Sequence, residues 1–289
     1  AFRSRLNRFY TNWKENRSTL WHAADSVTIV CGKATELLTY KKTSAITLWL
    51  WGYEVIDTVL VFTEKTLYVV TGSSKAKVLG PISEAVAANA GEPTVEFVVR
   101  ARGQDADAER AQLRAVLDHT KESFDGRCVG ALVKGLRHET GPMVAAWNQV
   151  VEQAGYEQVE IGKAIARLLA VKDETEQKMM RTAASITQAV MKNFFVTKLE
   201  EVIGSEKKVT HESIADYIDG LLSDPRKISR KLSAETVDAC YAPIVQSGGD
   251  YNLRPSARSK ATTLHYGTIV CSVGSRYKCY CSNVARTLF

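Results

Sequence analysis

The chain has 289 residues, 45% of them hydrophobic, and a formal net charge of +6. This length and composition predict a globular protein with one large or two ordinary domains, and the basic balance suggests an acidic or polyanionic partner. The most apolar uncharged run, residues 43–53, is far shorter than the ~20 residues that a membrane-spanning helix needs. The sequence therefore contains no predicted membrane span.

The six cysteines form no CxxC pair. Closely spaced pairs are typical of structural zinc sites, and disulfide frameworks belong to small secreted chains. We therefore interpret these cysteines as reduced thiols of an intracellular protein.

Strand-like and helix-like segments alternate through the first part of the chain. We expect helices over residues 2–17, 44–51, 106–123 and 142–153, strands over residues 26–30, 58–62, 66–70, 94–100, 128–133 and 159–161, and a turn around residues 72–74. Such alternation predicts an α/β domain with a mixed, partly parallel sheet. We place this domain at residues 1–170.

The remaining residues, 171–289, are predicted to form a second domain that begins with a long helix. Asp173 and Glu176 have the spacing of a capping box at its start. Its predicted buried face contains Met179, Ala183, Ile186, Val190 and Phe194. A second helix over residues 210–222 is predicted to bury Ile214, Tyr217, Ile218, Leu221 and Leu222, and a basic loop and strands follow it.

The two ends of the chain predict that it is part of something longer. The first residue is Ala1 rather than Met, and the chain stops at Phe289 within a strand-like pattern. We therefore expect the second domain to be incomplete at its C-terminus.

The order of elements in the second domain resembles the pita-bread catalytic lobe of the aminopeptidase P, prolidase and methionine aminopeptidase family. The matching landmarks are residues 243–248, Gly274, Tyr277 and the Arg286–Thr287 pair. The resemblance implies two metal-ligand aspartates, and Ser272 and Asn283 stand at those positions. It also implies a histidine after the Ser–Gly turn, which we expect near Arg254, because His265 is too close to the following strand.

Elementary metal chemistry gives the same interpretation of this segment. Two divalent cations need several charged oxygen ligands, and the side chains of Ser272 and Asn283 are neutral. No Asp or Glu occurs from Tyr251 to Phe289, whereas six Lys and Arg residues do. We therefore predict a pseudoenzyme that binds no metal or other cofactor. The alternative is an active aminopeptidase or prolidase with a rearranged site.

Four segments resemble the N-terminal, aminopeptidase-like domain of the large subunit of the FACT histone chaperone. They are residues 49–54, 180–187, 246–253 and 280–287. The resemblance implies a nuclear, chromatin-associated chaperone without peptidase activity that reorganises nucleosomes in transcription, replication and repair. Its implied partners are core histones, bound weakly through the central tetramer and its tails, a smaller HMG-type subunit, and transcription or replication factors.

Two interpretations of the degenerate site remain open. In one, a relic pocket binds a peptide, and its candidate residues are Gln246, Ser247, Gly248, Arg254, Tyr277 and Arg286. In the other, which we favour, Ser272 and Asn283 satisfy local hydrogen bonds in a filled core. Ser247 lacks the GxSxG pattern of a serine hydrolase, and the scattered histidines have no catalytic spacing.

The basic segments 226–231 and 254–260 do not predict a nucleic-acid interface, because aromatic residues are not interleaved with the cations. A contact with basic histones needs an acidic patch, such as Glu54 with Asp57, or Glu200, Glu201 and Glu206. If neither patch binds histones strongly, the strong histone contacts lie elsewhere in the full protein. We favour that second option, with a weak auxiliary contact here.

Overall fold

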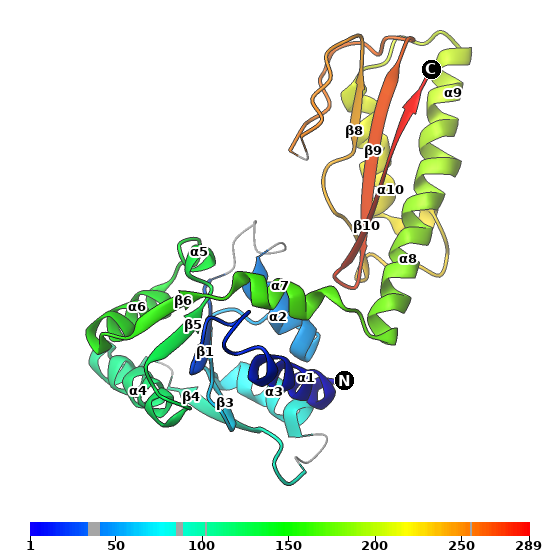
Figure 1. The fold of residues 1–289 in the computed structure, drawn as a ribbon. Helices are drawn as coiled ribbons and strands as arrows, with labels where there is room; N and C mark the ends of the chain where they lie inside the picture. The colour runs from blue at the N-terminus through cyan, green and yellow to red at the C-terminus, as the bar shows by residue number, and fades with distance from the viewer. Residues whose placement is uncertain (34–40, 85–88, 102, 255) are drawn as a thin grey trace. The chain divides into compact units, whose positions relative to one another are not determined.

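The structure, a computed structural model, describes residues 1–33, 41–84, 89–101, 103–254 and 256–289. They divide into two units, Ala1–Val171 and Lys172–Phe289 (Figure 1). No described helix is both long and apolar enough to cross a membrane.

The first unit contains a six-stranded mixed sheet in the order β4-β3-β2-β1-β5-β6. The strands are β1 (Ser26–Cys31), β2 (Thr58–Phe62), β3 (Thr66–Gly72), β4 (Thr94–Arg100), β5 (Cys128–Ala131) and β6 (Glu157–Glu160). β2 pairs antiparallel with β1 and β3, whereas the β3–β4, β1–β5 and β5–β6 pairs are parallel. The predicted mixed α/β sheet is therefore confirmed.

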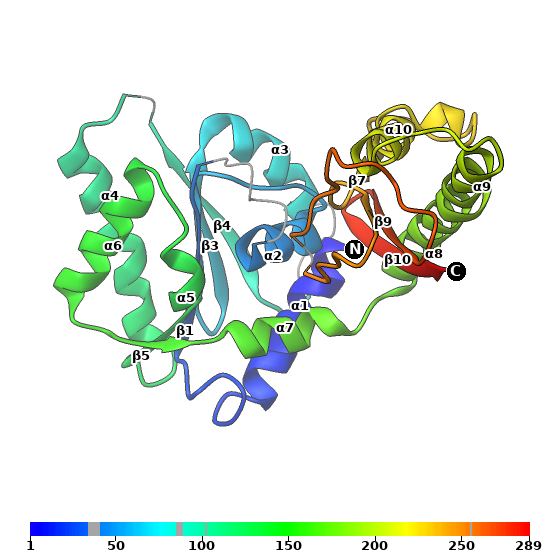
Figure 2. The ribbon, with the colours of Figure 1, turned by 90° about the horizontal axis from the view of Figure 1, so that it is seen from above.

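Helices cover both faces of this sheet. They are α1 (Phe2–Glu15), α2 (Lys42–Trp51), α3 (Ser73–Glu84), α4 (Ala106–Asp118), α5 (Val133–Leu136), α6 (Pro142–Ala154) and α7 (Gly162–Ala170), with a 3₁₀ turn at His119–Glu122. Figure 2 shows α4 and α6 on one face and α1, α2, α3 and α7 on the other. This double cover explains why every residue of β1 and β2 is buried.

Helix α1 supplies the predicted apolar stripe, because Leu6, Phe9, Tyr10 and Trp13 are all buried. The ring of Phe9 stacks on that of Phe62 in β2, with 4.2 Å between ring centroids. The entry helix is thus held to the sheet mainly by aromatic burial.

In the first unit, two local predictions are wrong and one helix was missed. The turn expected around residues 72–74 is the start of α3, and the strand expected at residues 128–133 ends at Ala131, with Val133 already in α5. Helix α7 was not predicted. α3 contains Gly80 and Pro81, and α5 has four residues, so neither shows a clear helical periodicity.

The second unit packs helices against one face of a small sheet. Its helices are α8 (Glu174–Val190), α9 (Thr197–Gly204) and α10 (His211–Ser223), with a π-helical segment at Met191–Val196 and a 3₁₀ turn at Pro225–Lys227. Its strands are β7 (Val237–Ala239), β8 (Ile244–Ser247), β9 (Ile269–Tyr277) and β10 (Tyr280–Leu288). Both side chains of the predicted Asp173–Glu176 capping box make their bonds, which confirms it.

The π-helical segment changes which residues the long helix buries. Val190 is buried as predicted, but beyond it Phe195 is fully buried and Phe194 only partly. One extra residue in the turn rotates the following side chains, so the predicted regular face is wrong at Phe194. Tyr217 on α10, also predicted to be buried, is 41% exposed.

Asp25, which lies just before β1, joins distant parts of the first unit. Its side chain accepts hydrogen bonds from the backbone N–H groups of Arg127 (2.9 Å) and Cys128 (3.0 Å) and pairs with Arg17. Burial by itself raises the pKa of this carboxyl, but the bonds from Arg127, Cys128 and Arg17 outweigh burial and lower it.

The lowered pKa of Asp25 predicts a loss of stability in acid. At neutral pH, Asp25→Asn is expected to lower the free energy of unfolding by about 2 kcal/mol, because hydrogen bonds to a charged group are lost. The difference should shrink as the pH falls from the unfolded carboxyl pKa of about 3.9 through the lower folded value, because native Asp25 then becomes protonated.

Urea unfolding at several pH values, followed by tryptophan fluorescence, measures this effect. All the tryptophans, residues 13, 21, 49, 51 and 147, lie in the first unit, so the signal reports on that unit. Asp107→Asn, an exposed helix residue, is the matched control. A difference in stability between the parent and the Asp25→Asn variant that did not change with pH would contradict the prediction.

Candidate functional site

Strand β9 determines which residues of the second unit share a surface. It pairs antiparallel with β10 on one side and with β7 and β8 on the other. Ser272 lies opposite Ala285, and Asn283 lies opposite Gly274. Residues directly opposite point to the same face. The two predicted ligand positions are therefore diagonal neighbours on one face of the sheet.

Alternate residues of β9 point to the opposite face, which packs against the helices. Cys271, Val273 and Ser275 are fully buried there. The Ser275 hydroxyl bonds to Thr187 of α8 at 2.7 Å and donates to the carbonyl of Ala183 at 3.0 Å. The Ser272 side of the sheet is thus the side that α8 does not cover.

Tyr241, from the connection between β7 and β8, packs on the Ser272 side. Its hydroxyl forms a hydrogen bond of 2.7 Å with the Ser272 hydroxyl. A Cβ placed on Gly274 would lie 2.9 Å from Cε1 of Tyr241 and 3.2 Å from Cβ of Asn283. The absence of a side chain at Gly274 therefore lets the tyrosine ring lie directly on the strand, beside both ligand positions. Sequence reasoning missed Tyr241.

Cys240 and Cys281 lie beside the same surface. The Cys240 N–H donates to the carbonyl of Gly274 at 2.9 Å, and its thiol is hydrogen-bonded to that of Cys281. This hydrogen bond, with a smaller contribution from Arg276, lowers the pKa of Cys281 to about 7, although burial opposes it. Cys281 therefore has thiolate character near neutral pH.

Ser247 and His211 form a buried polar cluster on the helix side of the sheet. The Nδ1 of His211 lies 2.8 Å from the carbonyl of Thr262, which can only accept, so Nδ1 carries the proton. Nε2 of His211 then accepts from the Ser247 hydroxyl at 2.8 Å, and the Ser247 oxygen accepts from the N–H of His265 at 2.8 Å. Every polar atom of the pair has a partner, so the cluster joins α10 to β8.

The neighbouring Gln246 holds the following turn. Its amide accepts from the N–H of Asn252 at 2.8 Å and donates to the Asn252 carbonyl at 3.0 Å. Gly248 and Gly249 have φ angles of +79° and +87°, a region that glycine adopts without strain. The Gln-Ser-Gly-Gly segment is thus a hydrogen-bonded turn.

The structure does not gather the six candidate pocket residues into one site. Gln246 and Ser247 line a shallow pocket of about 140 Å³ with His211, Asp250 and Arg258 among its other residues.

The other candidates lie apart from that pocket. The strand register places Arg286, like Cys271, on the helix side, Tyr277 packs partly against the core there, and Arg254 is exposed in the loop.

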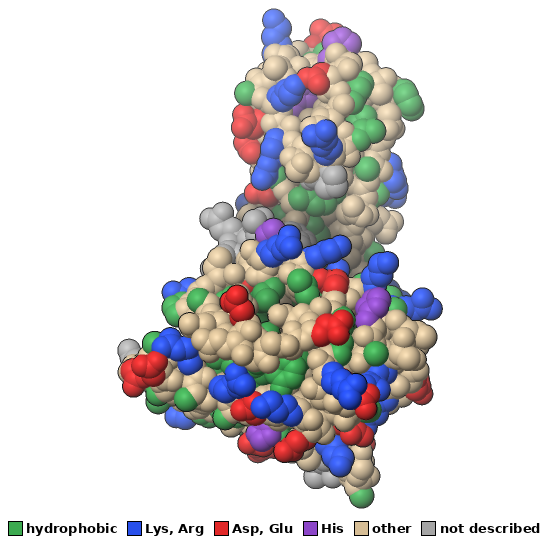
Figure 3. Space-filling view, turned by 60° about the vertical axis from the view of Figure 1, so that its left-hand side comes forward, with side chains coloured by type: hydrophobic (Ala, Val, Ile, Leu, Met, Phe, Trp, Pro, Cys, Tyr) green, Lys and Arg blue, Asp and Glu red, His purple; other side chains and the backbone are tan. Residues whose placement is uncertain are grey.

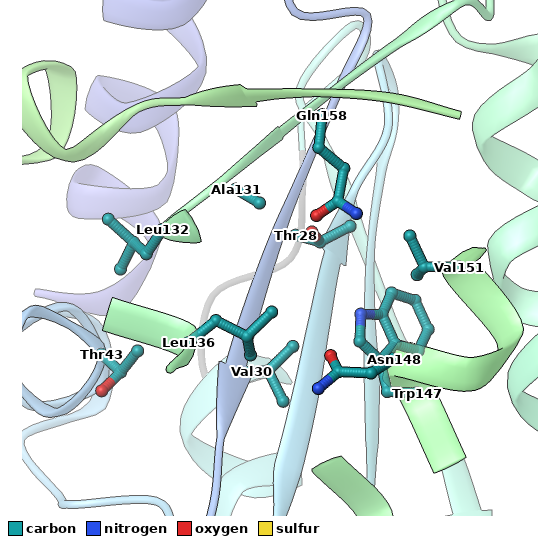
Figure 4. Close-up of a pocket in the computed structure, with 10 residues that line it drawn as sticks. All are labelled: Thr28, Val30, Thr43, Ala131, Leu132, Leu136, Trp147, Asn148, Val151 and Gln158. Carbon is teal, nitrogen blue, oxygen red and sulfur yellow. The ribbon is translucent and has the colours of Figure 1, made fainter. Parts of the chain in front are cut away.

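A small cavity lies in the first unit between the sheet and α6 (Figure 4). Its volume is about 20 Å³, and Thr28, Asn148 and Gln158 supply polar groups to its wall. Such a volume accommodates about one water molecule. This cavity is therefore too small for an organic ligand.

The Ser247 cluster generates a stability prediction. Ser247→Ala leaves Nε2 of His211 and the N–H of His265 without their buried partner, so we expect a cost of about 1–3 kcal/mol. Hydrogen exchange of the amides in β8 and α10, followed by mass spectrometry, should show weaker protection. The exposed Ser256→Ala is the control, and equal protection in both variants would refute the role of Ser247.

Two family models match the chain. The FACT complex subunit SPT16 N-terminal lobe domain matches residues 1–164, and metallopeptidase family M24 matches residues 178–289. The FACT complex subunit SPT16 of Zea mays is 36% identical over 289 residues, which cover 99% of this chain and 27% of the relative. The subunit of Dictyostelium discoideum is 35% identical over 288 residues and is covered to 26%. The chain thus spans about a quarter of these relatives.

Solved structures give the same assignment of the fold. The N-terminal domain of FACT complex subunit SPT16 from chickpea, Cicer arietinum, matches with a TM-score of 0.87 and 34% identity, over 99% of this chain and 66% of that one. A prolidase from Thermococcus sibiricus matches in fold, with a TM-score of 0.62 and 17% identity over 100% of this chain and 65% of that one. The predicted pita-bread resemblance is therefore confirmed. The chain belongs to the FACT complex subunit SPT16 family, whose N-terminal domain consists of a mixed α/β lobe and an M24 peptidase-like unit.

Proposed function

We propose that the chain is a non-catalytic, peptidase-like part of a histone chaperone that binds histones or other chromatin proteins while nucleosomes are reorganised. Membership of the FACT subunit family supports the chaperone role. The contact between Tyr241 and Ser272 carries the non-catalytic part of the proposal, because it occupies the surface where the peptidase resemblance places metal ligands.

The residues at that surface do not fit a pair of divalent cations. Ser272 and Asn283 offer neutral oxygens, and the Ser272 oxygen is already bonded to Tyr241. Within the four strands β7, β8, β9 and β10, all of them described, Asp238 is the one acid, and it pairs with Arg276 at 3.3 Å. A cation at this surface would lie near Arg276, which is paired with Asp238, and near neutral groups. This geometry therefore does not support metal-dependent hydrolysis.

Metal analysis and a peptidase assay test this part of the proposal. After dialysis against Mn²⁺, Co²⁺ or Zn²⁺, the chain is expected to retain much less than one ion per molecule and to leave Xaa-Pro peptides intact. In the double variant Ser272→Asp/Asn283→Asp, two carboxylates share one face, so its metal retention should rise above that of the parent. Stoichiometric metal together with turnover in the parent would favour the active-peptidase alternative.

Histones are basic, so their contact surface on this chain should be acidic or rich in hydrogen-bonding groups. Charges of both signs are mixed over the face shown in Figure 3. The acidic patches considered from the sequence are partly neutralised, because Asp57 lies 3.7 Å from Arg100, and Glu201 pairs with Lys198 and Lys207.

Helix α10 offers a better acidic surface. Glu212, Asp216 and Asp219 follow one another at spacings of four and three residues, which places them on one helix face. None of the three makes an ion pair with a described residue, and Glu212 and Asp216 are exposed. We propose that this face contributes a weak, auxiliary contact with the tails of the central histone tetramer.

The remaining parts of the proposal come from the family assignment. A FACT subunit works in the nucleus on chromatin, with a smaller HMG-type subunit and with transcription or replication factors as partners. The interleaved charges and the lack of aromatic residues among the basic loops favour protein contacts over DNA contacts for this chain. The strongest histone contacts are assigned to other parts of the full-length protein.

A calorimetric titration with histone H3–H4 tetramers, intact and without tails, tests histone binding. We expect a dissociation constant in the micromolar range or weaker at moderate salt, and weaker binding without tails. Glu212→Lys/Asp216→Lys should weaken binding by about tenfold, since two attractive charges become repulsive.

The matched control for this charge reversal is Glu84→Lys/Glu152→Lys, which changes two exposed helical acids of the first unit. Equal weakening by both double variants would argue against the α10 surface. No complex with any histone preparation would reject the histone-binding part of the proposal.

A further inference from the structure

A pocket of about 870 Å³ opens in the first unit, at the carboxyl ends of the parallel strands β1, β5 and β6. Its walls come from the starts of α2, α5 and α7, from the connections beside them, and from His22 in the connection between α1 and β1. Basic side chains predominate among its polar lining: His22, Lys41, Lys42, Lys134, His138 and Lys163. This volume lies within the range of ligand-binding pockets.

Two carboxylates also line the pocket, and the first of them is fully used by the protein. Glu139 is buried and accepts hydrogen bonds from the N–H of Gly32 and the hydroxyl of Thr43, both at 2.8 Å. Lys41 lies 3.5 Å from the same carboxylate and donates to the carbonyl of His138. Glu139 therefore neutralises Lys41 and none of the other cations.

The second carboxylate, Glu160, is held by backbone groups. It accepts from the N–H of Lys134 at 2.8 Å and from that of Gly162 at 2.7 Å. These bonds cap the starts of α5 and α7, so the two helix termini are already occupied. Backbone N–H groups are neutral, so Glu160 keeps its negative charge, and the described lining has four lysines against two carboxylates. A ligand therefore meets an excess of positive charge.

Lys134 and Lys163 are exposed, and their ammonium groups form no ion pair or hydrogen bond with any described residue. A Cβ on Gly162 would lie 3.2 Å from Nζ of Lys42 and 2.6 Å from Oε1 of Glu160, which places a third ammonium at the pocket wall, close to the Glu160 carboxylate. An excess of cations around a concave surface raises the local concentration of anions and fixes their position when they bind.

The shape and lining of the pocket favour a peptide over a nucleic acid. Its described lining contains Leu132 and Gly135 beside the cations. These two residues can pack against the carbon atoms of a peptide. The described lining contains no Phe, Tyr or Trp on which a base could stack, and a concave pocket excludes a duplex.

We propose that this pocket binds a short anionic segment of a partner protein, with negative charge supplied by aspartate and glutamate or by a phosphorylated side chain. The site is independent of the proposed histone contact, because histones are basic and this pocket repels them. The chain would thus bind an acidic protein partner through its first unit.

Fluorescence anisotropy with labelled hexaglutamate tests the proposal on the 289-residue chain. Lys134→Glu/Lys163→Glu is expected to weaken binding by at least about tenfold, because two attractive charges become repulsive. Circular dichroism of this double variant checks that it folds, and Lys134→Gln/Lys163→Gln, which adds no carboxylate beside Glu160, should also weaken binding, by less than the glutamate pair. Lys77→Glu, an exposed lysine of α3 in the same unit, is the matched control and should leave the affinity unchanged.

Competition experiments identify the source of the charge. The competitors are a Gly-Ser peptide with one phosphoserine and inorganic phosphate. If the peptide displaces hexaglutamate more strongly than inorganic phosphate does, the natural ligand is a phosphorylated segment. If both displace it weakly, the natural ligand is a carboxylate-rich segment. Three results would overturn the proposal: no binding of either peptide, equal binding of neutral hexaglutamine, or equal weakening by Lys77→Glu. A further comparison uses a six-nucleotide oligothymidylate. If it binds as tightly as hexaglutamate and loses as much affinity in the Lys134→Glu/Lys163→Glu variant, the ligand is single-stranded nucleic acid instead of a peptide.

Discussion

Strand β9 pairs with three other strands, and its alternating side chains therefore fix the two faces of the second unit. Cys271, Val273 and Ser275 are buried against the helices, so Ser272 and Gly274 must lie on the other side. A shift of the register by one residue would exchange these sets and place a glycine and polar groups in the core. The packing of the helices thus also determines where the degenerate site lies.

The peptidase-like unit uses its polar residues to hold its own structure together. Ser272 bonds to Tyr241, Ser247 to His211 and His265, and Gln246 to the backbone of Asn252. In a metallopeptidase, charged oxygens at such a face would bind cations and activate water. Neutral groups that are already hydrogen-bonded have no comparable chemistry to offer, which is the physical basis of the proposed non-catalytic role.

The net charge of the chain conceals an uneven distribution. Helix α10 carries acids without ion-pair partners among the described residues, whereas the described lining of the first-unit pocket has four lysines against two carboxylates. Interactions between exposed charges are screened within about 8–10 Å. The local balance of charge at a surface, not the net charge of the chain, therefore decides which partner that surface attracts. The two proposals together give the chain a surface for a basic protein and a separate pocket for an acidic one.

The sequence by itself determined the α/β order of the first unit, the capping box at Asp173, the aromatic stripe of α1 and the neutral residues at positions 272 and 283. These features depend on local periodicity or on spacing within one hairpin, which the chain encodes over a few residues. Only the tertiary structure decided that Tyr241 lies on Gly274, that Phe195 replaces Phe194 in the core, and that Lys42, Lys134 and Lys163 line one pocket. Those residues meet because of strand order, a π-helical turn and the convergence of three helix starts, and no local pattern of side chains specifies such long-range contacts.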